Sequence, residues 1–185
     1  MPSPVPPHSE VTHMDLVPDD PHANPTAWRI ALDACAGMLS MNTSKGLRPL
    51  YELPHFQGSF SISREGVLAG FRLRLPLPSE ARLAQAGTAA ELSWESMSLD
   101  ADGPVNSLGG RARLLLGRRE TFTDVSALCA KIPGERPYIK IVLETVFSPV
   151  ALHWPTDGWQ RLRPVTLTLF SEIRPAEVGS QEPPA

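Results

Sequence analysis

Proline is the sequence feature that most limits what this chain can fold into. There are 20 prolines in 185 residues, about twice the usual share. An interior proline removes a backbone hydrogen bond and clashes with the preceding helical turn, so the count argues against a mostly helical protein. Seven prolines lie in residues 1–25 and three in residues 175–185. The other ten fall mainly at the ends of apolar runs, where strands are expected to end.

The charge distribution follows the same division of the chain. Residues 1–24 and 175–185 contain acids but no Lys or Arg, and all 17 basic residues, 14 of them Arg, lie between these ends. Residues 26–174 hold 14 acids, which leaves this segment at +3, although the whole chain is at −3. We expect a disordered acidic arm over residues 1–24, one α+β domain over 25–174 and a disordered tail over 175–185.

The segment after Asn24 predicts an N-terminal amphipathic helix. Asn24 is a good N-cap, and Pro25 suits the first helical position. Apolar residues then recur at steps of three and four until Gly46 signals a stop: Trp28, Ala31, Leu32, Cys35, Met38 and Leu39. Two short helices are also expected, over Ser79–Ala86 and Asp124–Lys131.

Beyond residue 55 the apolar period changes to two, which predicts strands. Phe60 and Ile62 alternate with serines, and Phe71, Leu73 and Leu75 alternate with arginines, so this part reads as a β-hairpin. The clearest strand is Tyr138–Phe147, which is half apolar on its second face, as for a central strand partly covered on both sides. The expected fold is therefore α+β, with the N-terminal helix packed on a mainly antiparallel sheet of six to seven strands. Leu152–Trp154 is expected as a short edge strand, and Asp100–Gly110 as a long loop.

Composition also bounds the setting in which the protein works. Cys35 and Cys129 are 94 positions apart and form no disulfide framework. The first residues lack the pattern of a secretory signal, and no apolar run is long enough to predict a transmembrane helix. We therefore expect a cytoplasmic protein with no membrane contact. The abundance of Ala, Pro, Gly and Arg is typical of a GC-rich bacterial genome.

No motif in the sequence predicts catalysis, so we lean against an enzyme. The five histidines and two cysteines show no metal-ligand spacing, and no G-x-S-x-G nucleophile elbow is present. We expect no catalytic residue, no metal and no cofactor. The preferred hypothesis is a non-catalytic protein-interaction or assembly component, with a protein partner or a homo-oligomer. Trp154 and Trp159, which flank a predicted Asp-Gly turn, are candidate contact residues.

A second hypothesis is a nucleic-acid-binding module. Its candidate residues follow Gly109-Gly110, a glycine pair whose backbone N–H groups could hold a phosphate: Arg111, Arg113, Arg118 and Arg119. Over about eleven residues this segment resembles the glycine-rich basic loop of CRISPR-associated repeat-RNA-binding (RAMP) proteins, and the resemblance implies RNA binding. The same residues also fit a strand that is entered through a glycine turn and carries its arginines on the wet face.

A third hypothesis is a small-ligand-binding protein or enzyme. It places a pocket between the N-terminal helix and the sheet. Trp28, Phe71 and Trp94 would line this pocket, and His55 would lie at its mouth.

Overall fold

The described part of the protein consists almost entirely of β-strands. The computed structural model describes residues 28–63, 66–78, 91–101, 106–135, 137–154, 160 and 162–175. Its elements, in chain order, are β1 (Trp28–Ile30), the 3₁₀ turn η1 (Leu32–Ala34), β2 (Ala36–Thr43), β3 (Gly46–Leu53), β4 (Gln57–Ile62), β5 (Leu68–Pro76), β6 (Glu91–Ala101), β7 (Ser107–Leu116), β8 (Arg119–Ile132), β9 (Tyr138–Phe147) and β10 (Val165–Pro175).

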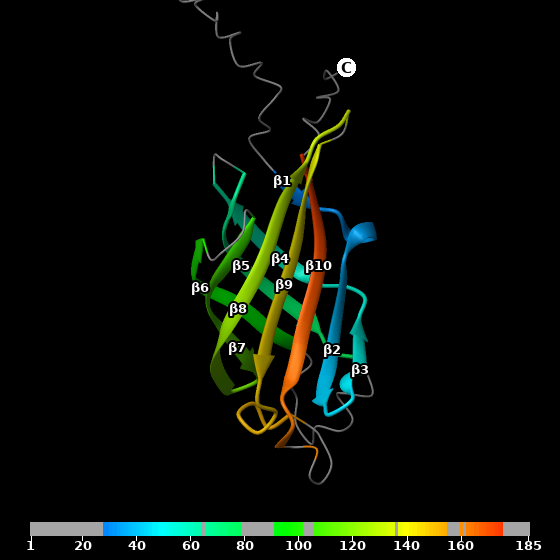
Figure 1. Ribbon diagram of the computed structural model, residues 1–185, viewed down its shortest axis with the longest axis vertical. Helices are drawn as coiled ribbons and strands as arrows, with labels where there is room; N and C mark the ends of the chain where they lie inside the picture. Colours follow the sequence, from blue (N-terminus) through cyan, green and yellow to red (C-terminus); the bar gives the residue numbers. More distant parts are fainter. Residues whose placement is uncertain are drawn as a thin grey trace, which may run out of the picture.

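All ten strands belong to one antiparallel sheet (Figure 1). From β4 to β10 each strand pairs with the next along the chain, so this part is a meander. β10 then pairs with β2, and β2 with β3, which gives the order β3-β2-β10-β9-β8-β7-β6-β5-β4. β1 also pairs with β10, through Trp28–Ile30 and Ile173–Pro175.

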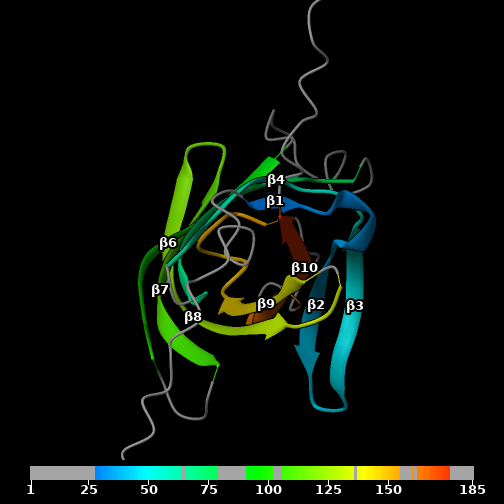
Figure 2. The same cartoon turned by 90° about the horizontal axis from the view of Figure 1, so that it is seen from above.

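The sheet curls until its two edge strands approach each other, as the view from above shows (Figure 2). β3 and β4 lie at opposite ends of the strand order but are joined by residues 54–56 alone. Three linking residues reach about 14 Å at most, so the end of β3 and the start of β4 must be close. Phe56 in this link is buried, and its ring centroid lies 6.4 Å from that of Phe60 in β4.

The concave face of the curled sheet holds the hydrophobic core. Strand alternation places every second side chain of β5 to β10 on this face, and most of these side chains are completely closed to water. The rings of Phe71 in β5 and Trp94 in β6 meet edge to face, with centroids 5.1 Å apart. The turn that follows β9 adds Leu152 and Trp154 to the core, and the Trp154 ring centroid lies 6.0 Å from that of Phe147.

The predicted N-terminal helix is wrong, and with it the α+β class. Residues 28–30 and 36–43 are strands that hydrogen-bond along β10, and only η1 turns between them. Leu32, expected on the buried stripe, is 69% exposed, whereas Leu39 and Met41 are buried at a spacing of two. Apolar residues at positions 31, 35 and 39 fit both the helical period and the strand period, because the stretch is short. Pairing with β10 makes this segment a strand.

The expected helix over Asp124–Lys131 is also wrong, because these residues lie within β8. Val125, Ala127 and Cys129 point into the core while the residues between them are exposed, which is the period of a strand. The segment Leu152–Trp154 belongs to a turn and its exit rather than to an edge strand, and strands β6 and β7 extend into the expected loop over Asp100–Gly110. The helix expected over Ser79–Ala86, the arm over 1–24 and the tail after Pro175 lie outside the described residues.

Several strand predictions are confirmed. β4 and β5 form the expected antiparallel hairpin, and β9 has the predicted bounds Tyr138–Phe147. The sheet is antiparallel throughout its described strands, as expected, but the described residues contribute ten strands instead of six or seven. Within the described part of the chain, no helix is long and apolar enough to cross a membrane.

Candidate interaction surface

The convex face of the sheet carries the solvent-facing side chains of its strands. One half of it, over β5 to β8, is rich in charged side chains that lie opposite one another. The other half, over β8 to β10, carries exposed apolar side chains. The two halves therefore offer different chemistry to a partner.

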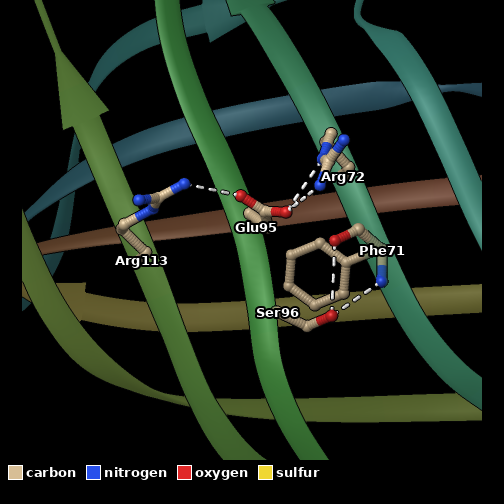
Figure 3. Close-up of polar contacts among 5 residues, drawn as sticks. All are labelled: Phe71, Arg72, Glu95, Ser96 and Arg113. Atoms are coloured by element: carbon tan, nitrogen blue, oxygen red, sulfur yellow. Dashed lines mark hydrogen bonds and ion pairs between the residues drawn. The ribbon is translucent and has the colours of Figure 1, made fainter.

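Glu95 lies at the centre of the charged half, between two arginines on neighbouring strands (Figure 3). Its Oε1 accepts a hydrogen bond from Arg72 Nε of β5 at 2.8 Å, and its Oε2 accepts one from Arg113 Nη2 of β7 at 2.9 Å. Register explains the contact, because Glu95 lies directly opposite both arginines. The hydrogen bonds from Arg72 and Arg113 hold the pKa of the Glu95 carboxyl below its usual value.

The other strand arginines of this half also face carboxylates. Arg111 lies 3.5 Å from Asp124, and Arg74 lies 3.9 Å from Glu91. Of the four arginines that were predicted to hold nucleic acid, Arg111 and Arg113 therefore face carboxylates within the sheet. Arg118 and Arg119, in and after the β7–β8 turn, are exposed.

Gly110, the second glycine of the pair, has a structural explanation. β6 contains an irregularity between Ser96 and Ser98, and there its backbone comes so close to Gly110 that a Cβ would overlap the Ser98 carbonyl oxygen. Gly109 and Gly110 leave a shallow hollow on the convex face, whose rim includes Asp100, Arg111, Ser126 and Glu144. Among the described residues, no group of three or more His, Cys, Asp or Glu side chains could hold a metal ion.

Three apolar residues cross neighbouring strands at one level. Leu128 of β8 lies directly opposite Val142 of β9, and Val142 lies directly opposite Phe170 of β10. Leu128 is 53% exposed and Phe170 is 46% exposed. We call these three residues the apolar row. Single exposed apolar residues are ordinary on a protein surface, whereas large contiguous apolar patches mark interaction sites.

The predicted pocket residues do not assemble as expected, because the helix that was to cover them is absent. Phe71 and Trp94 do meet, but inside the curled sheet, where both are buried. His55 is exposed in the link between β3 and β4. Trp28 lies in β1, which pairs with the same edge of β10 as β2 does. The side chain of Trp28 is outside the described part.

The two indoles proposed as contact residues are not paired by the described structure. Trp154 is buried, with its ring centroid 6.3 Å from that of Tyr51 in β3, so it belongs to the core. Trp159 lies outside the described residues.

The sequence reasoning missed the apolar row and the role of Glu95. The alternation of Val125, Ala127 and Cys129 was a signal for a strand that would place Leu128 outward. The half-apolar second face predicted for Tyr138–Phe147 did point to Val142. Which residues lie opposite Val142 and Glu95 depends on strand register, which no local pattern specifies.

Comparison with known proteins adds information about the fold. No protein-family model matches the chain, and no curated protein matches it significantly. Similar solved structures include that of BcnA from Burkholderia cenocepacia, which is 12% identical, covers 78% of this chain and 99% of its own, and superposes with a TM-score of 0.57. At this identity the likeness shows a shared fold and nothing about function.

Proposed function

We propose that this chain is a non-catalytic interaction or assembly component that binds a protein through the apolar row. The observation that carries the proposal is the direct register of Leu128, Val142 and Phe170 on the convex face, together with the exposure of the two outer residues. Burying apolar surface is the main driving force of protein association. The strands beneath the row are held by their pairing and by the core, so they offer a preformed contact surface.

Site-specific photo-cross-linking in the native host tests this proposal. A photoreactive phenylalanine analogue at position 170 should give a discrete cross-linked product. The matched control is the same analogue at Met97, which is 63% exposed but lies on β6, away from the row. A product from position 170 that is absent from position 97 supports the proposal. No product from position 170, or equal products from both positions, overturns it.

A second candidate function is the binding, inside the curled sheet, of a small molecule that is largely apolar but carries a hydrogen-bond acceptor, and Trp94 favours it. Its Nε1–H is buried and has no hydrogen-bond acceptor among the described residues, and an unsatisfied buried donor costs about 1–3 kcal/mol. A ligand carrying a carbonyl or carboxylate could accept this hydrogen bond. The candidate comes second because the surrounding core side chains are closed to water, so that a ligand would have to displace them.

Fluorescence titration with a labelled fatty acid tests the second candidate. Saturable binding that weakens roughly fivefold to tenfold in Trp94→Phe, which keeps an aromatic ring but removes the donor, supports it. Absence of saturable binding to the unaltered protein overturns it.

A further inference from the structure

The outward face of β9 is complementary to itself. β9 presents Tyr138, Lys140, Val142, Glu144 and Val146 on the convex side, since the residues between them point into the core. Val142 is at the centre, with a positive charge two residues before it and a negative charge two residues after it. We infer that a second copy of this chain covers the apolar row in a two-fold symmetric dimer, an inference that rests on the interaction function proposed above.

Charge selects the direction of the two-fold axis. If the axis runs across the strands at Val142, the β9 strands of the two copies lie face to face in opposite directions. Lys140 of each copy then meets Glu144 of the other, and Tyr138 meets Val146. If the axis runs along the strands instead, Lys140 meets Lys140 and Glu144 meets Glu144, and like charges repel. The first arrangement is therefore the one that we propose.

The neighbouring strands fit the same arrangement. With the axis across the strands, Leu128 faces Leu128 and Phe170 faces Phe170 of the second copy, so each residue of the apolar row faces its own counterpart. On β10, Glu172 lies two residues beyond Phe170 and would meet Thr168, a neutral residue. On β8, Ala130 would meet Ser126. None of these directly facing pairs places like charges together.

The size of the surface predicts a reversible dimer. Three strands spaced about 4.8 Å apart, each with about ten residues rising about 3.3 Å, offer roughly 500 Å² per copy. The total of roughly 1,000 Å² is at the lower end of specific protein interfaces. We therefore expect monomer and dimer to exchange, with a dissociation constant in the micromolar range.

Analytical ultracentrifugation with charge reversals tests the inference. The unaltered chain should shift from monomer to dimer with rising concentration, and K140E and E144K should each raise the dissociation constant roughly tenfold. An equimolar mixture of K140E and E144K should dimerise as well as the unaltered chain. In the mixed dimer, the K140E copy carries carboxylates at positions 140 and 144, and the E144K copy carries ammonium groups at both positions. Each carboxylate therefore faces an ammonium group. A mixture that is as weak as the single variants overturns the two-fold arrangement.

Two further variants keep the test independent of folding defects. F170K should abolish the dimer, whereas the control M97K should leave it intact, and melting temperatures will show whether each variant folds. If the unaltered chain stays monomeric up to millimolar concentration, the inference is overturned. In that case, a cross-linked product from position 170 with the mass of a different protein would still support the proposed interaction function. If no cross-linked product forms, both the proposed interaction function and the inferred dimer are overturned.

Discussion

Gly110 of β7 lies against the carbonyl oxygen of Ser98 in β6, so closely that no side chain fits between them. The contact arises because β6 carries an extra residue between Ser96 and Ser98, which breaks the regular spacing of the two strands. The sequence analysis placed Gly110 in a possible anion-binding loop. The structure shows that the close packing of the β6 and β7 backbones requires a glycine at this position.

The Gly110 contact predicts a large effect of one added methyl group. Gly110→Ala should lower the free energy of unfolding by about 3 kcal/mol, because the Cβ can be accommodated only if the two strands move apart. Urea denaturation measures this loss. Ser98→Ala is the control, because it leaves the carbonyl oxygen in place and alters only an exposed side chain, with an expected change within about 0.5 kcal/mol. Equal stability of Gly110→Ala and the unaltered protein would contradict the contact.

The ion pairs of Glu95 predict a pH-dependent contribution to stability. The folded protein lowers the pKa of this carboxyl, so the unfolded chain takes up a proton first as the pH falls. Glu95→Gln should cost about 1 kcal/mol or less at pH 7, since the side chain is partly exposed. The difference from the unaltered protein should shrink as the pH falls through the lowered pKa.

Denaturation curves at pH 7 and at pH 3, each at low and high salt, check this prediction. Glu120→Gln is a suitable control, because Glu120 makes only a 4.0 Å contact with Arg113. A stability difference between Glu95→Gln and the unaltered protein that stays constant from pH 7 to pH 3 would show that the charge of Glu95 is not its cause.

Two buried threonines predict strong non-additivity. Thr145 Oγ1 lies 2.7 Å from Thr123 Oγ1 and 2.6 Å from the Asp124 carbonyl oxygen, and both side chains are buried. Thr145→Val should cost about 1–3 kcal/mol, because it leaves the Thr123 hydroxyl in the core without this partner. The double variant Thr123→Val/Thr145→Val should cost less than the sum of the two single variants, and a double-mutant cycle in urea measures the difference. Simple additivity would refute the coupling.

Cys129 is predicted to be chemically protected. Its side chain is buried and burial raises the pKa of the thiol, so little of the reactive thiolate forms at neutral pH. In a Cys35→Ala background, iodoacetamide should modify Cys129 only as fast as the protein unfolds. The reaction should accelerate strongly in denaturant. Fast labelling under native conditions, at the rate of a small-molecule thiol, would show that the position is open to solvent.

Local sequence patterns were enough to locate several of the strands beyond residue 55. Alternation of apolar and polar residues located β4, β5 and β9, because a strand with one buried face needs this period whatever its partners are. The positions of the prolines indicated where strands end for a similar local reason. The missing N–H and the fixed φ of a proline are properties of the residue itself.

The N-terminal strands and the candidate surface depend on contacts between distant parts of the chain. The apolar residues from Ala31 to Leu39 fit a helix as well as a strand, and the choice comes from hydrogen bonds to β10, more than 120 residues away along the chain. Glu95 gains its two arginines, and Val142 its apolar neighbours, from the register of paired strands. Register depends on the whole curled sheet, because shifting one strand by a single residue would turn its entire buried face outward.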